Sequence, residues 1–133
     1  MRLLTILGAY VAAALAGMLF LVGYLTAVDG WLGDFTVIVA MGAFAFGFAG
    51  AAPVALPVIL ATELRESGPW WVFTGAGLIA GLLIASIFGP DAELAPFLLG
   101  AACCALAGFT YWLIAWRLYP PKAITAGAPT SPE

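Results

Sequence analysis

Four long runs without a charged side chain dominate this sequence. Each run is 23 to 28 residues long, and about 20 apolar residues are enough for a helix to cross the hydrocarbon core of a bilayer. None of the runs alternates between polar and apolar residues as a membrane strand does. Because backbone groups in lipid must be hydrogen-bonded within the chain, the runs predict helices. They are bounded by Arg2 and Asp29, Asp34 and Glu63, Glu66 and Asp91, and Glu93 and Arg117.

The predicted fold class is all-α, a polytopic membrane four-helix bundle. Its spans cover residues 3–28, 35–62, 69–89 and 94–117, which places residues 1–119 in a single transmembrane domain. Only 8% of the residues are charged, against about 25% in a soluble domain, so the composition excludes a soluble enzyme and a nucleic-acid binder. The first run is longer than the roughly 7–15 apolar residues of a signal peptide, so it is interpreted as a retained span.

The basic residues predict the orientation of the bundle. All four of them precede the first span, join the second span to the third, or lie at or beyond the end of the fourth span: Arg2, Arg65, Arg117 and Lys122. The other two connections contain only acidic charges. The positive-inside rule therefore predicts that both termini are cytoplasmic. Residues 120–133 are rich in proline and small side chains and predict a disordered cytoplasmic tail.

The second span is interrupted by two prolines. Pro53 and Pro57 cannot donate hydrogen bonds to the carbonyls of Ala49 and Pro53, and Gly50 lies beside them. This pattern predicts a bend in the helix. Interrupted spans also form ion and substrate sites in transporters, so Ala49, Gly50, Pro53 and Pro57 are a candidate substrate or ion site. A bend without such a site is the alternative.

Small residues recur every four positions on the third span. Helices in lipid associate through close contacts at small side chains, so this stripe predicts either packing within the bundle or contact with a partner. The charged turn before the span is either simply solvated or a second place where a partner could bind. The residues of the candidate partner contact are Glu63, Arg65, Glu66, Gly77, Gly81 and Ala85.

Few side chains are suited to catalysis or to metal binding. The chain has no histidine, and its two cysteines, Cys103 and Cys104, are adjacent within the fourth span, where they are interpreted as packing residues. No charge lies deep in a span, which argues against a proton-coupled carrier. We expect no enzyme activity, no metal and no cofactor. An enzyme that acts on lipid would need Glu63 or Glu66 as its acid or base.

The stretch from Pro57 through Gly75 resembles small, uncharacterised bacterial four-span inner-membrane proteins. In these proteins a second span rich in proline and alanine runs into an acidic residue, a short arginine-containing turn and a third span rich in aromatic residues and glycine. The matching positions are Pro57, Glu63, Arg65, Phe73 and Gly75. The resemblance implies a multi-pass protein of a bacterial inner membrane, and it implies no particular activity.

Two functions agree with these features. The first is a non-enzymatic accessory, assembly or anchoring subunit of a larger membrane complex, because little of the chain lies outside the spans. The alternative is a small homo-oligomeric channel or carrier, with its site at the interrupted second span. The expected partners are the lipid bilayer and either other membrane subunits or further copies of this chain. Nucleic acid is not expected as a partner, because the chain has a net charge of -3.

Overall fold

The computed structural model describes residues 2–29, 35–87 and 94–120. These residues form four helices, α1 (Arg2–Asp29), α2 (Phe35–Leu64), α3 (Trp70–Ile87) and α4 (Leu94–Trp112), and a short π-helix, η1 (Leu113–Leu118), continues α4. There is no strand in this part of the chain. Each of the four helices is long and apolar enough to cross a membrane, which confirms the predicted all-α class with four candidate spans.

The predicted spans agree with the helices to within a few residues. Helix α2 continues to Leu64, two residues beyond the predicted end of the second span. The fourth predicted span corresponds to α4 together with η1, and its change from α-helix to π-helix was not predicted. The connections at residues 30–34 and 88–93 lie outside the described residues, as does the predicted tail apart from Pro120.

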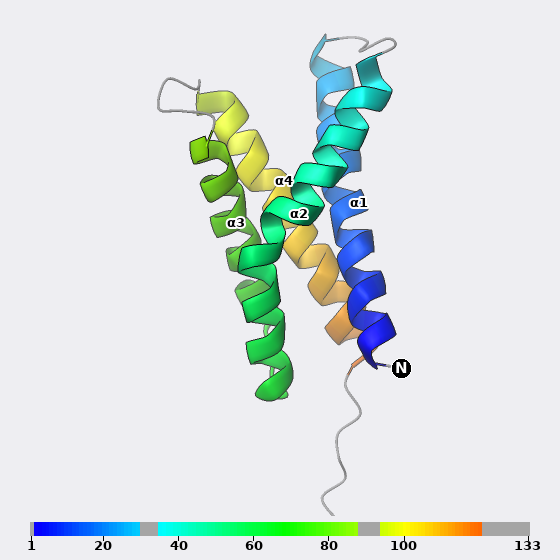
Figure 1. Ribbon diagram of the computed structural model, residues 1–133, viewed down its shortest axis with the longest axis vertical. Helices are drawn as coiled ribbons and strands as arrows, with labels where there is room; N and C mark the ends of the chain where they lie inside the picture. The colour runs from blue at the N-terminus through cyan, green and yellow to red at the C-terminus, as the bar shows by residue number, and fades with distance from the viewer. Residues whose placement is uncertain (1, 30–34, 88–93, 121–133) are drawn as a thin grey trace, which may run out of the picture.

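Successive helices run in opposite directions, and α4 lies between α1 and α3 (Figure 1). Helix α2 also contacts α1 and α3, but it crosses α4 with little direct contact. Helix α2 remains one continuous helix through Pro53 and Pro57, and Figure 1 shows that its two halves run in different directions. Neighbouring helices therefore pack in the pairs α1–α2, α2–α3, α3–α4 and α1–α4. Helices α2 and α4 face each other across the middle of the bundle.

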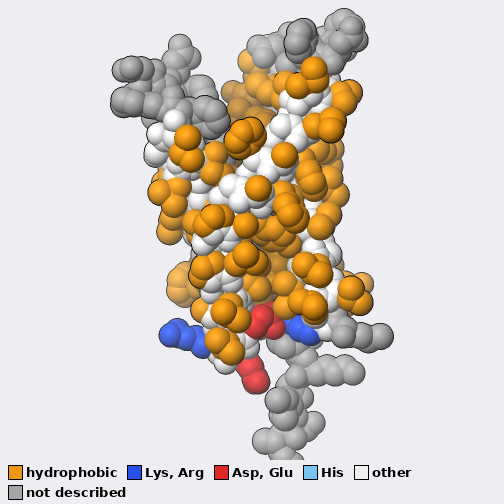
Figure 2. Space-filling view, viewed as in Figure 1, with side chains coloured by type: hydrophobic (Ala, Val, Ile, Leu, Met, Phe, Trp, Pro, Cys, Tyr) orange, Lys and Arg blue, Asp and Glu red, His pale blue; other side chains and the backbone are white. Residues whose placement is uncertain are grey.

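Apart from Ala80, Ala101 and Cys103, the buried apolar side chains gather in one half of the bundle. They come from the first part of α1, the last part of α2, the start of α3 and the end of α4 with η1: Ala9, Ala13, Ile59, Phe73, Tyr111 and Ala115. The charged side chains Arg2, Glu63, Arg65, Glu66 and Arg117 lie at this same end, below a surface that is mostly apolar (Figure 2). The large apolar side chains on the outer faces suit a lipid environment.

Glycines allow α3 and α4 to approach each other closely. A Cβ atom built on Gly81 would lie 2.7 Å from the Cα atom of Ala101. A Cβ atom on Gly77 would overlap the backbone carbonyl of Cys104, and one on Gly108 would overlap that of Phe73. Real Cβ atoms almost never come this close to backbone, so these contacts need glycine.

We predict that Gly77→Ala destabilises the protein by about 1–3 kcal/mol, because the added methyl group forces α3 away from α4. Gly75→Ala is the matched control, since a Cβ atom at Gly75 meets nothing within 4 Å. The control should stay within about 1 kcal/mol of the wild type, the usual size of a glycine-to-alanine change in a helix. Denaturant unfolding of the detergent-solubilised protein measures both values. Equal stabilities for the two variants would contradict the close contact.

Candidate functional site

A central cavity of about 400 Å³ lies between the four helices. All four helices contribute to its wall, and the lining is almost entirely apolar; representative residues are Gly17, Ala51, Ala80, Cys103, Cys104 and Tyr111. The cavity is partly open to the outside of the bundle, so it is a deep groove between the helices and not an enclosed void. Its volume falls within the roughly 300–1,000 Å³ that is usual for small-molecule sites.

Small residues on the facing sides of α2 and α4 cause the cavity. Gly42 and Gly47 of α2 line it, and a Cβ atom on either glycine would meet nothing within 4 Å. Gly100 and Ala107 line it from α4. These side chains are too short to reach across the middle of the bundle, so the space between the two helices stays unfilled. Such an apolar space favours an apolar occupant over water.

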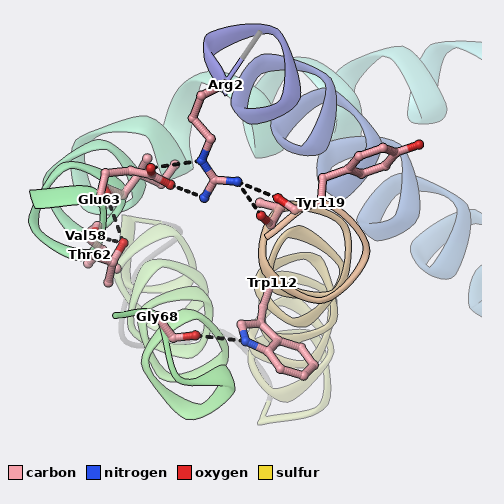
Figure 3. Close-up of polar contacts among 9 residues, drawn as sticks. Arg2, Val58, Thr62, Glu63, Gly68, Trp112 and Tyr119 are labelled. Atoms are coloured by element: carbon pink, nitrogen blue, oxygen red, sulfur yellow. Dashed lines mark hydrogen bonds and ion pairs between the residues drawn. The ribbon is translucent and has the colours of Figure 1, made fainter. Parts of the chain in front are cut away.

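Arg2 closes the bundle at the end nearest the deeply buried residues. Its Nε atom donates to Oε2 of Glu63 at 3.0 Å, and its Nη2 atom donates to Oε1 at 2.5 Å (Figure 3). This two-point ion pair joins the start of α1 to the end of α2. The side chains are 27% and 21% exposed, so the pair is screened from most of the solvent.

The same guanidinium binds the end of η1. Its Nη1 atom donates to the carbonyl oxygens of Ala115, at 2.6 Å, and Tyr119, at 2.7 Å. An α-helix would pair the Ala115 carbonyl with the N–H of Tyr119, but in η1 that N–H donates to Ile114 instead. The next residue, Pro120, has no N–H. The arginine therefore supplies a donor to a carbonyl that the backbone leaves open.

Trp116 completes what we call the Arg2 cluster, namely Arg2, Glu63, Ala115, Trp116 and Tyr119. The guanidinium carbon of Arg2 lies 5.3 Å from the centre of the Trp116 ring, within the range of a cation–π contact. The carbonyl ends of α2 and η1 meet here and carry partial negative charge, to which Glu63 adds a full charge. The positive charge of Arg2 offsets the negative charge of the two helix ends and of the Glu63 carboxylate.

The turn between α2 and α3 is held against the end of α4 and against η1 by a glycine and two tryptophans. Trp112 Nε1 donates to the carbonyl oxygen of Gly68 at 2.9 Å. A Cβ atom on Gly68 would overlap the Trp116 ring, so this position also needs glycine. The N–H groups of Glu66 and Ser67 bond back to Glu63 and Thr62, as in a Schellman motif.

Glu66 adopts the left-handed conformation in this motif, with a φ of 50°. Glycine or asparagine usually occupies such a position, because a longer side chain costs about 1–2 kcal/mol there. The glutamate is exposed. The backbone thus accepts strain at a residue whose carboxylate projects from the charged end of the bundle.

Tyr111 lines the cavity, but its hydroxyl is sealed from it. It is 3% exposed, and its ring lies 5.2 Å from that of Phe73, centre to centre, at the end of the cavity nearest the Arg2 cluster. Its hydroxyl has no hydrogen-bond partner among the described residues. A buried polar group without a partner costs about 1–3 kcal/mol, so this hydroxyl calls for an explanation.

The candidate site on the second span does not coincide with the cavity. Ala49, Gly50, Pro53 and Pro57 are all exposed, and none of them lines the cavity. The neighbouring positions Gly47, Ala51 and Ala55 line it instead, from another face of the same helix. In the distorted turn, Tyr10 donates a hydrogen bond to the carbonyl oxygen of Phe48 at 2.6 Å.

The residues of the candidate partner contact are divided among several environments. Glu63 is paired with Arg2, whereas Arg65 and Glu66 are exposed. Gly77 and Gly81 face α4 of the same chain, so an outside partner cannot reach them while α3 and α4 stay together. Ala85 is half-buried.

Sequence reasoning missed the Arg2 cluster and Tyr111. From the sequence, Arg2 served only to predict orientation, and Glu63 belonged to the candidate partner contact. A signal was nevertheless present, since Arg2 and Glu63 are opposite charges expected at the same membrane face. Cys103 and Cys104 were expected to be packing residues, and as free thiols they line the cavity wall. No group of acidic residues and cysteines in the described ranges could hold a metal ion.

Comparison of the chain with protein-family models, with curated proteins and with solved structures found no match. Function is therefore inferred from the geometry of the central cavity and of the Arg2 cluster.

We predict that Arg2→Met lowers the free energy of unfolding by about 1–3 kcal/mol, because Glu63 and two carbonyls lose their donor in a half-buried site. Arg2→Lys should fall between Arg2→Met and the wild type, since an ammonium group cannot reproduce the planar two-point pairing. Arg65→Met is the control, because Arg65 is exposed at the same end of the bundle. Thermal unfolding in detergent ranks the four proteins. A lysine variant as stable as the wild type would show that charge alone is sufficient.

Proposed function

We propose that the chain binds a small apolar molecule between its four helices and acts as a carrier for it. The observation that supports this function is the cavity of about 400 Å³ with an apolar wall from all four helices. The site of the proposed carrier is this inner face of α2, in place of the proline-bearing face considered from the sequence. All four helices of one chain contribute to the wall, and the cavity stays partly open to the outside of the bundle.

The packing of the bundle supports an entrance far from the Arg2 cluster. The buried core and the ion pair both lie at one end, and they hold α1, α2 and η1 together there. In the other half the two hairpins, α1 with α2 and α3 with α4, diverge (Figure 1). We therefore place the movement that admits a ligand in that half of the bundle.

A second candidate is the accessory or anchoring subunit of a larger complex. The exposed Arg65 and Glu66 favour it, because the strained turn presents both charges at the end of the bundle. Mild extraction from the membrane at native expression separates the two candidates. Unlike subunits recovered at a fixed ratio support the accessory function, whereas recovery of this chain alone supports the carrier.

The cavity itself can be tested with the two native cysteines. Monobromobimane is a small, uncharged thiol reagent, and we expect it to enter the cavity and alkylate Cys104 or Cys103. Ala51→Leu should slow this labelling severalfold, because the larger side chain projects into the cavity. Ala49→Leu is the matched control on the exposed face of the same helix. Mass spectrometry of the protein in amphipol measures the rate, and equal labelling of the two variants would contradict an accessible cavity.

We also propose that the Arg2 cluster faces the cytoplasm of a bacterium and that the chain resides in the inner membrane. The basis is the position of Arg2, Arg65 and Arg117 at one end of the bundle, together with the positive-inside rule. Alkaline phosphatase, which is active only outside the cytoplasm, should be inactive when fused after Glu133 and active when fused after Asp91. The reverse pattern would invert the orientation.

A further inference from the structure

The side chain of Phe46 lies where the cavity meets the outer surface of the bundle. The cavity is partly open to the outside, and Phe46 lines it while being 66% exposed. Among the large apolar side chains that the described residues expose, Phe46 is the one that also belongs to the cavity wall. We call this place the Phe46 opening. It belongs to the half of α2 that leads away from the Arg2 cluster, where the two hairpins diverge (Figure 1).

The Phe46 opening is far from both ends of its helix. Phe46 follows the start of α2 at Phe35 by 11 residues, which is about 17 Å along the helix axis. The hydrocarbon core of a bilayer is roughly 30 Å thick, so an opening at this depth faces its middle. The chain ends of lipids from the two leaflets meet there. The opening would therefore face hydrocarbon, and both water and lipid head groups would be distant.

The wall offers a ligand no polar group to bind. Tyr111 lines the cavity, but its hydroxyl is sealed from it, and the hydroxyl of Tyr10 donates to the carbonyl oxygen of Phe48 at 2.6 Å. The other lining residues are glycines or carry hydrocarbon or sulfur side chains. A polar head group inside the cavity would lose its hydration without compensation. The cavity can thus select a ligand only by the shape of its apolar part.

The cavity is long and narrow. On α4 the lining positions extend from Gly100 to Tyr111, and on α1 they extend from Tyr10 to Leu21. Each distance is about 16 Å along the helix axis. A volume of about 400 Å³ over this length gives an average cross-section of about 25 Å². This is enough for one straight hydrocarbon chain and too narrow for two. An empty apolar space destabilises a protein in proportion to its volume, which favours such an occupant.

We propose that the cavity takes up one straight hydrocarbon chain of a membrane lipid, which enters through the Phe46 opening with its methyl end first. The head group stays outside the bundle and is not recognised. This assignment rests on the proposed function, and it adds the class of ligand and the place of its entry.

The first test varies the lipid around the full-length protein. The rate at which monobromobimane alkylates Cys103 and Cys104 is measured in nanodiscs of dimyristoyl or diphytanoyl phosphatidylcholine, which share a head group. Their chains are straight and methyl-branched, respectively. Labelling should be about 3- to 10-fold slower in the straight-chain lipid, because a narrow cavity that excludes a methyl branch loses about that much binding. Dimyristoyl phosphatidylglycerol, with another head group, should give the same slow rate.

A cysteine on the lipid-facing surface corrects for the amount of reagent in each bilayer. Met41→Cys supplies it in a chain that also carries Cys103→Ala and Cys104→Ala, because Met41 is 68% exposed and lies outside the cavity wall. Each rate for the native cysteines is divided by the rate for this chain in the same lipid.

The second test concerns the place of entry. Phe46→Ala should speed the labelling of Cys103 and Cys104 severalfold in lipid-free protein in amphipol, because the smaller side chain widens the opening. Met41→Ala is the matched control, since Met41 is equally exposed on the same half of α2 and does not line the cavity. Equal rates for the two variants would show that entry does not occur beside Phe46.

The remaining outcomes separate this inference from the proposed function. If the corrected rates are equal in straight and branched lipid while Ala51→Leu still slows labelling, the cavity stands and the class of ligand is wrong. If the rate follows the head group instead of the chain, the ligand is recognised by its polar end and the inference is also wrong. If neither the lipid nor Ala51→Leu changes the labelling, the proposed function itself fails.

Discussion

The rest of the bundle depends on how a single guanidinium, that of Arg2, is satisfied where three helix ends meet. It joins the start of α1 to the end of α2 through Glu63 and to the end of η1 through the carbonyls of Ala115 and Tyr119. Two helix ends and a carboxylate would otherwise place uncompensated negative charge together in a half-buried site. With these ends fixed, the two hairpins can diverge elsewhere without separating completely.

Small residues have two opposite effects in this structure. At Gly77, Gly81 and Gly108 the absence of a Cβ atom lets α3 and α4 come into backbone contact. At Gly42 and Gly47 the same absence leaves open space, because α4 lies too far away to fill it. The difference comes from the path of α2, which contacts α1 and α3 and crosses α4 without packing on it. Close packing on one side therefore coexists with a cavity in the middle.

The number, length and class of the helices follow from charge-free runs bounded by charged residues, and these features were predictable. The cavity was not, because a glycine such as Gly47 looks the same in a sequence whether it faces a neighbour or a void. The ion pair between Arg2 and Glu63 joins positions 61 residues apart, so it depends on the order of the helices around the bundle. The prolines drew attention to one face of α2, although Ala51 and Ala55 on another face line the cavity.

The Arg2 cluster and the cavity are physically connected through aromatic rings. Phe73 lies 5.2 Å from Tyr111 and 6.2 Å from Trp116 between ring centres, and Trp116 in turn stacks near the guanidinium of Arg2. Interiors that are closely packed transmit displacement from one side chain to the next. A movement of Arg2 away from Glu63 would thus shift the ring that carries the unpaired hydroxyl. The end of the cavity at Tyr111 and the closed end of the bundle are consequently one structural unit, although they belong to different parts of the sequence.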